Sequence, residues 1–320
     1  MDKDLTHQIV VGVDGSGAAE RALAWAKSFA DVSGGDISAV SAWRYPVAAM
    51  PGTWAPAPAP EMMQDATSSM LDGSVDRVLG EGEGRRVVRQ GSSSMVLLDE
   101  AKDAELLVVG RSGAGGWLGT GLGSTARQCA HHAETPLVIV GDEAEPLPAE
   151  PKVLVAVDGS DHSVNALVWA LQSFGGHQPV TAVHSHDEWI LDDILDEDEL
   201  ARRLQDQATD RLADAVDIAR GRSGTEGAVA TVSYLEVCIV GAPLAAHAVA
   251  GRIEPAHRVD LRVVRGDPRT TVWDVAREME ADVVVVGARG KTGIVGAVIG
   301  SFTSHAVHHC PPTMSLAVIP

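Results

Sequence analysis

Short apolar runs alternate along this chain with longer segments in which apolar residues recur at helical spacing. Runs such as IVVGV and LLVV in the first half are rich in branched residues and short enough for buried strands. Segments such as ERALAWAKSFA have the spacing of an amphipathic helix. The pattern predicts strands near residues 8–13, 37–42, 86–90, 105–109 and 137–140, and helices over 17–31, about 61–80, 93–102 and 123–133.

The second half repeats this order of elements. It predicts strands near 152–157, 180–185, 261–265, 282–286 and 315–318, and helices over 161–174, 197–220, 269–279 and 300–309. Nearly continuous apolar strands separated by helices are typical of a parallel sheet with both faces covered. We therefore predict an α/β protein of two tandem domains, each a five-stranded parallel sheet flanked by helices.

The two halves are also similar in sequence. IVVGVDGSGAAERALAWA at 9–26 aligns with VLVAVDGSDHSVNALVWA at 153–170, a separation of 144 residues. Further along, VVG at 108–110 aligns with VVG at 285–287, a separation of 177 residues. The second half therefore contains 33 additional residues in its middle. A repeat of this length indicates two domains. We place them at 1–142 and 152–320, joined by the proline-rich, acidic segment 141–152, with an insertion at about 221–258.

Composition excludes several classes of function. The formal net charge of −19 argues against a nucleic-acid-binding protein and against binding to an anionic membrane surface. Cys129, Cys238 and Cys310 have no paired spacing, which favours a reduced, cytoplasmic setting. The apolar stretch 237–250 is shorter than the roughly 18 residues expected of a membrane-spanning helix.

A glycine and serine pattern of identical spacing follows the fourth predicted strand of each half. It comprises Gly110, Gly113, Gly123 and Ser124 in the first half, and Gly287, Gly290, Gly300 and Ser301 in the second. Glycine allows unusual backbone angles and close approach to a ligand, and consecutive N–H groups of such a loop can surround an anion. A serine at a helix start can cap the helix, and the helix dipole there favours negative charge. The pattern predicts phosphate binding, although a sharp turn with close helix packing would also explain the glycines.

An aspartate ends the first predicted strand of each half, Asp14 and Asp158. If the strand order is 3-2-1-4-5, strands one and four are neighbours, and the ligand crevice lies beyond their carboxyl ends. Each aspartate would then face the glycine loop and could accept hydrogen bonds from a ribose or an adenine amino group. The alternative is that each aspartate only caps the following helix.

Together these residues resemble the ATP-binding branch of the universal stress protein family, whose motif is G-x2-G-x9-G-[ST] with an aspartate after the first strand. The resemblance implies an adenine-nucleotide hydrolase-like fold, strand order 3-2-1-4-5, and ATP, with or without Mg²⁺, as ligand. It also implies that backbone at Ala42 and Ser185 contacts adenine. Lesser candidates beside the glycines are Val109, Ser112, Thr125, Val286, Arg289 and Phe302.

The halves differ at two of these positions. Ser112 stands where the second loop has Arg289, so an arginine that holds phosphates would make the two sites differ in affinity. Phe302 stands where a smaller residue such as Thr125 is expected, and it would crowd the second site.

The function that the resemblance implies is an ATP-binding stress-response regulator that acts through a nucleotide-dependent conformational or partner-binding change. The resemblance does not identify the protein partner, and it leaves open whether the chain forms a homodimer. The alternative is a slow ATPase or autophosphorylating protein that uses Ser124 or Ser301, and a third interpretation is a scaffold without nucleotide. Changing Gly123 or Ser124 and measuring phosphate release would separate the first two.

Other motifs are weaker. A P-loop ending at Lys291 would need glycine at Val285, and the first-strand turns lack the dinucleotide-binding fingerprint. We expect the histidine pairs at 131–132 and 308–309 to interact with helix carboxyl ends rather than bind metal. Trp25 and Trp169 are expected in the core.

Overall fold

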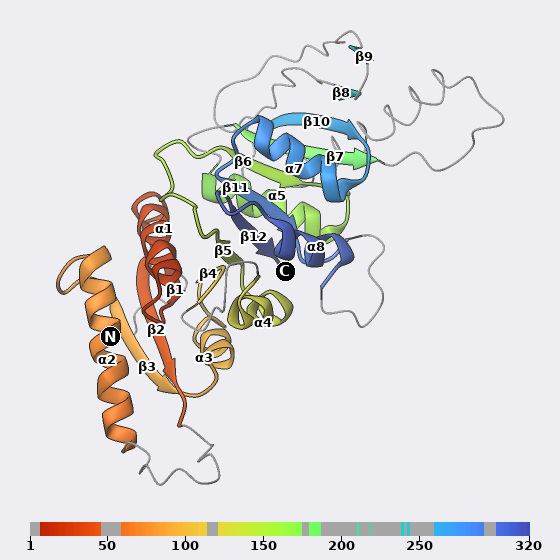
Figure 1. Cartoon of the computed structure of the whole chain (residues 1–320). Helices are drawn as coiled ribbons and strands as arrows, with labels where there is room; N and C mark the ends of the chain where they lie inside the picture. Colours follow the sequence, from red (N-terminus) through yellow and green to blue (C-terminus); the bar gives the residue numbers. More distant parts are fainter. Residues whose placement is uncertain are drawn as a thin grey trace. The chain divides into compact units, whose positions relative to one another are not determined.

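The computed structural model describes residues 7–45, 59–113, 121–174, 179–186, 259–290 and 299–320, together with residues 210, 218, 238–239 and 242–243. The chain divides into two compact units, Met1–Leu147 and Pro148–Pro320, and the division falls in the segment expected to be a linker. Each unit contains its own sheet (Figure 1).

Unit 1 is a five-stranded parallel sheet with four described helices. Its elements are β1 (Gln8–Gly12), α1 (Gly17–Ser33), β2 (Asp36–Trp43), α2 (Pro60–Val78), β3 (Arg85–Gln90), α3 (Ser93–Glu100), β4 (Leu106–Gly110), α4 (Ser124–His132) and β5 (Leu137–Val140). Within the unit the strands lie in the order β3-β2-β1-β4-β5, every pair parallel. The predicted strand order 3-2-1-4-5 is confirmed.

Unit 2 has the same arrangement. Its elements are β6 (Val153–Ala156), α5 (Asp161–Phe174), β7 (Val180–His186), β10 (Val259–Arg265), α7 (Pro268–Glu278), β11 (Val283–Gly287), α8 (Ser301–His309) and β12 (Ser315–Ile319). The order is β10-β7-β6-β11-β12, again entirely parallel. Because β10 pairs with β7 as β3 pairs with β2, the alignment of the third strands is confirmed.

Some predictions fall on residues outside the described part of the chain. These are most of the helix over 197–220 and most of the insertion at 221–258. Within the insertion, the two-residue strands β8 (Cys238–Ile239) and β9 (Ala242–Pro243) pair antiparallel. None of the described helices is long and apolar enough to cross a membrane.

The sheets are buried because helices cover both faces. In unit 1, α1 packs against α2, and α3 packs against α4. Figure 1 shows these two helix pairs on opposite faces of the sheet. The interior strands β4 and β11 are accordingly buried along almost their whole length, as their unbroken apolar runs require. Trp25 and Trp169 lie in the core as predicted, Trp25 stacked on Phe29 with ring centroids 5.4 Å apart.

The first glycine of each motif allows the first turn of α1 or α5 to pack directly against the end of the fourth strand, backbone against backbone. A Cβ atom at Gly110 would lie 2.7 Å from the carbonyl oxygen of Ala18, the second residue of α1. A Cβ atom at Gly287 would lie 2.6 Å from the carbonyl carbon of His162 at the equivalent place in α5. The obstacle is backbone in both units, so any side chain would push the helix away.

We expect Gly110→Ala to lower the free energy of unfolding of unit 1 by about 1–3 kcal/mol, because the added methyl group cannot be accommodated without moving α1. Differential scanning calorimetry of the full chain measures this. Gly73→Ala is the matched control, since Gly73 is an exposed helical residue whose Cβ would meet nothing within 4 Å. It should be neutral or stabilise by about 0.5–1 kcal/mol. Equal stability of the two variants would contradict the packing argument.

Cys129 of α4 gives a second prediction. Burial raises the pKa of its thiol from 9.0 to about 12. The folded state therefore holds this proton while the unfolded state loses it, and the stability that Cys129 contributes should decrease as the pH rises from about 9 to 12. At pH 8, iodoacetamide should modify Cys129 only after denaturation, as measured by peptide mass spectrometry. Modification of the folded chain at the rate of the denatured chain would refute this.

Candidate functional site

The candidate site of each unit lies where the first and fourth strands end side by side. β1 pairs with β4, and β6 pairs with β11. Asp14 and Asp158 each lie two residues beyond the first strand of their unit, and the glycine loop follows the fourth. The predicted neighbourhood of aspartate and glycine loop is therefore present in both units.

The two aspartates adopt matching conformations. Oδ1 of Asp14 accepts a hydrogen bond from the backbone N–H of Ser16 at 3.1 Å, and Oδ1 of Asp158 accepts one from Ser160 at 2.9 Å. The residue between is Gly15 or Gly159, with φ of 79° or 77°, a left-handed conformation that favours glycine.

The second carboxylate oxygen lies against the glycine loop. A Cβ atom at Gly113 would be 2.7 Å from Oδ2 of Asp14, and one at Gly290 would be 2.7 Å from Oδ2 of Asp158. The second glycine of the motif thus makes room for the aspartate. Helix capping belongs instead to the serines, since Ser16 Oγ accepts from the N–H of Ala19 and Ser160 Oγ accepts from the N–H of Ser163.

The third glycine connects the loop to the following helix. Gly123 donates its N–H to the carbonyl of Arg111, and Gly300 donates to that of Ala288, both at 2.8 Å. These glycines are the N-cap residues, so the expectation that Ser124 and Ser301 cap the helices is wrong; the serines are the first helical residues. None of the six motif glycines is in the left-handed region, so the motif requires glycine for space rather than for φ.

This arrangement leaves an electropositive helix end. Among the described residues no side chain caps the amino end of α4 or of α8. The first N–H groups of a helix lack intrahelical partners, and the helix dipole gives them partial positive charge. The amino ends of α4 and α8 therefore favour an anion.

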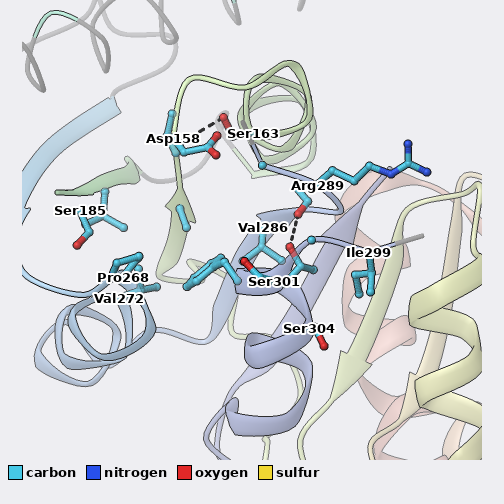
Figure 2. A pocket seen from close by; sticks show the side chains of 18 residues that line it. Asp158, Ser163, Ser185, Pro268, Val272, Val286, Arg289, Ile299, Ser301 and Ser304 are labelled. Atoms are coloured by element: carbon cyan, nitrogen blue, oxygen red, sulfur yellow. Dashed lines mark hydrogen bonds between the residues drawn. The ribbon is translucent and has the colours of Figure 1, made fainter. Parts of the chain in front are cut away.

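Unit 2 contains a cavity of about 580 Å³ at this place (Figure 2). Its volume falls in the range of small-molecule sites, roughly 300–1,000 Å³. The structure brings all nine candidates of the second half into its wall: Asp158, Ser185, Val286, Gly287, Arg289, Gly290, Gly300, Ser301 and Phe302.

The cavity has two chemically different ends. Figure 2 shows Ser185, Pro268 and Val272 at one end, and Arg289, Ser301 and Ser304 toward the other. The first end is mainly apolar, because the Ser185 hydroxyl is bonded to the carbonyl of Gly266 at 2.5 Å. The second end carries the helix start and the glycine loop, and the Arg289 side chain extends outward from this end (Figure 2).

Phe302 and Thr303 shape the wall beside the helix start. Phe302 is half-buried in the cavity wall, and the cavity persists beside it. Thr303 donates its hydroxyl to the carbonyl of Gly287 at 2.6 Å. This bond holds the first turn of α8 against the end of β11.

In unit 1 the remaining candidates occupy equivalent positions. Val13 donates its N–H to Val40 as Val157 does to Val183, which makes Ala42 and Ser185 structural equivalents at the ends of β2 and β7. Val109 belongs to β4, and Thr125 is the second residue of α4. The Ser112 hydroxyl is bonded to Oδ1 of Asp142 at 2.7 Å.

Comparison with known proteins now decides the family. A model of the universal stress protein family matches residues 6–141 and again residues 151–314. The chain belongs to the universal stress protein family. Because each half matches separately, it contains two universal stress protein domains, and the family is one of stress-response proteins.

Relatives that align over most of both chains support this assignment. A universal stress protein of Mycobacterium tuberculosis (strain ATCC 25618 / H37Rv) is 31% identical over 306 residues, covering 92% of this chain and 90% of the relative. One from Mycolicibacterium smegmatis is 27% identical over 307 residues, covering 93% and 92%. The crystal structure of a universal stress protein from Archaeoglobus fulgidus has the same fold, with a TM-score of 0.56, 14% identity and 98% of both chains covered.

The histidine pairs of this universal stress protein lie where they were predicted. His131 and His132 are in the last turn of α4, and His308 and His309 in that of α8. His305 stacks on His309 with ring centroids 3.9 Å apart, and burial together with His309 lowers the pKa of His305. Within the described part of the chain no group of three His, Cys, Asp or Glu residues is placed to hold a metal ion.

Sequence analysis missed several residues of the site. Pro268 and Val272 of α7 line the cavity, but an apolar residue of an amphipathic helix carries no signal that distinguishes a cavity wall from the core. Asp142, where the predicted first domain and the joining segment overlap, was not among the candidates, yet it bonds to the loop residue Ser112. Ser304 lines the cavity one helical turn beyond Ser301, a position that aligning the two halves could have indicated.

Proposed function

We propose that this universal stress protein binds adenine nucleotides, with ATP as the principal ligand, in both domains, and that a partner recognises the bound state. The observation that carries the proposal is the unit 2 cavity, which combines an aspartate, a glycine loop and an uncapped helix start. The same backbone arrangement in unit 1 supports a second site.

The cavity suits the three parts of a nucleotide. Val272 and Pro268 form an apolar wall for a base. An aromatic ring that packs against this wall is removed from water, which makes its binding free energy more favourable. Asp158 lies between the two ends, and a carboxylate accepts hydrogen bonds from ribose hydroxyls. The amino end of α8 and the loop N–H groups suit phosphate.

Binding, rather than rapid turnover, is the role that these groups support best. Mg²⁺, when it accompanies ATP, would be held mainly by phosphate oxygens and water, as is usual for this ion. Ser301 is exposed and lines the phosphate end of the cavity, which keeps slow hydrolysis or self-phosphorylation as the second candidate. A bound nucleotide would join the first strand, the glycine loop and the last helix, and so present them to a partner in one arrangement.

Isothermal titration calorimetry of the full chain with ATP and Mg²⁺ tests the proposal. We expect saturable binding that is lost in the Gly123→Asp, Gly300→Asp double variant. A Cβ atom on Gly123 would lie 3.1 Å from the carbonyl oxygen of Arg111, and one on Gly300 would lie 3.2 Å from the Cα atom of Arg289. The introduced side chains would therefore crowd the loop backbone, and their carboxylates would repel phosphate. A stoichiometry of two would mean that both domains bind, and a stoichiometry of one that a single domain does.

Gly73→Asp is the matched control, because it makes the same glycine-to-aspartate change, one negative charge, at an exposed position of α2 and should leave binding unchanged. Thermal unfolding of each variant verifies its fold. Absence of ATP binding by the unmodified chain would overturn the proposal. Released phosphate, or a mass increase of one phosphoryl group on Ser124 or Ser301, would instead support the second candidate.

A further inference from the structure

The phosphate ends of the two domains differ by a reciprocal exchange of arginine and serine. At the loop position before the second motif glycine, domain 1 has Ser112 and domain 2 has Arg289. At the fourth residue of the following helix, domain 1 has Arg127 and domain 2 has Ser304. Each domain therefore has one arginine and one serine, in opposite positions.

Both positions belong to the lining of the same cavity. In domain 2, Arg289 and Ser304 line it together with Ser301. Ser301 and Ser304 are three residues apart in α8 and so lie on one helix face. Gly123 of domain 1 and Gly300 of domain 2 have the same N-cap conformation and make the same hydrogen bond across the loop. Ser112 and Arg127 of domain 1 are therefore equivalent in position to Arg289 and Ser304 of domain 2.

The charges at these positions point to an anion. Arg127 and Arg289 are exposed, and within the described residues neither guanidinium forms an ion pair, whereas Arg77, Arg86 and Arg89 all do. A cation close to the amino end of a helix is unfavourable, because the helix dipole is positive there. An anion bound between the guanidinium and the helix start would remove that repulsion.

The exchange also has a local explanation in domain 1. The Ser112 hydroxyl is bonded to Asp142, so the loop position of domain 1 carries a neutral group beside a carboxylate. Arg21 Nη2 lies 3.9 Å from Oδ1 of Asp142, so this carboxylate already has one cation beside it. A phosphate at the loop would add negative charge there and would need a further cation. Arg127 of α4 carries such a cation.

We propose that Arg127 in domain 1 and Arg289 in domain 2 are the cations that bind the nucleotide phosphates, from the helix in one domain and from the loop in the other. This inference rests on the proposed nucleotide binding. It assigns phosphate recognition to different elements in two domains whose backbones match. The arginines should therefore affect ligands according to phosphate charge and leave the nucleoside part unaffected.

Titrations of the full chain, with one domain inactivated at a time, test the proposal. The Gly300→Asp background reports domain 1, and the Gly123→Asp background reports domain 2. In these backgrounds we expect Arg127→Ser and Arg289→Ser, respectively, to weaken ATP binding about tenfold, the effect of losing one hydrogen-bonded charge pair. The affinity for adenosine should remain within twofold.

A rescue variant separates phosphate binding from a structural role. Adding Ser112→Arg to Arg127→Ser gives domain 1 the arrangement of domain 2, and it should restore most of the lost ATP affinity. Arg85→Ser and Arg277→Ser are matched controls. Arg85 begins β3 and Arg277 is in the last turn of α7, whereas the glycine loops follow the carboxyl ends of the strands. Neither control should change ATP affinity.

The possible outcomes are distinct. If ATP binds to the parent chains but both arginine variants bind it within twofold of them, the inference is wrong and nucleotide binding stands. If ATP and adenosine weaken equally, or Ser112→Arg restores nothing, the arginines do not act on phosphate, and the inference is again wrong. If the unmodified chain does not bind ATP, both the inference and the proposed function fail.

Discussion

The close approach of a helix start to the end of the fourth strand is the constraint on which the candidate site depends. At Gly110 and Gly287 the first turn of α1 or α5, the first helix of each unit, meets the strand with no room for a side chain. This contact fixes the turn that carries Asp14 or Asp158 beside the glycine loop. The second and third glycines then accommodate the aspartate and the loop backbone. The motif spacing is thus a packing requirement first, and the space beside it becomes available to a ligand as a result.

Most of the fold could be predicted from the sequence because the decisive signals are local. Valine-rich runs such as 283–286 fit only a strand buried on both faces, and the duplicated VDGS turns fixed where the first strands end. The aspartate and the glycine loop could be placed together because parallel strands end at one edge of the sheet. The strand order was predicted from the family resemblance, and the observed strand pairing confirmed that order.

The parts that escaped prediction depend on tertiary neighbours. That Gly123 rather than Ser124 is the N-cap residue depends on a hydrogen bond to Arg111 across the loop. The wall formed by Pro268 and Val272 depends on how α7 lies against β7. Whether Asp14 caps a helix or faces the loop could not be decided from its position, because a serine two residues later competes for the cap.

The bond between Ser112 and Asp142 has a further consequence for communication along the chain. Asp142 lies two residues beyond β5, at the beginning of the covalent connection that leads into the second unit. The glycine loop of the first unit is therefore tethered to the first residues of that connection. A ligand that displaced Ser112 would break this bond and release Asp142 from the glycine loop.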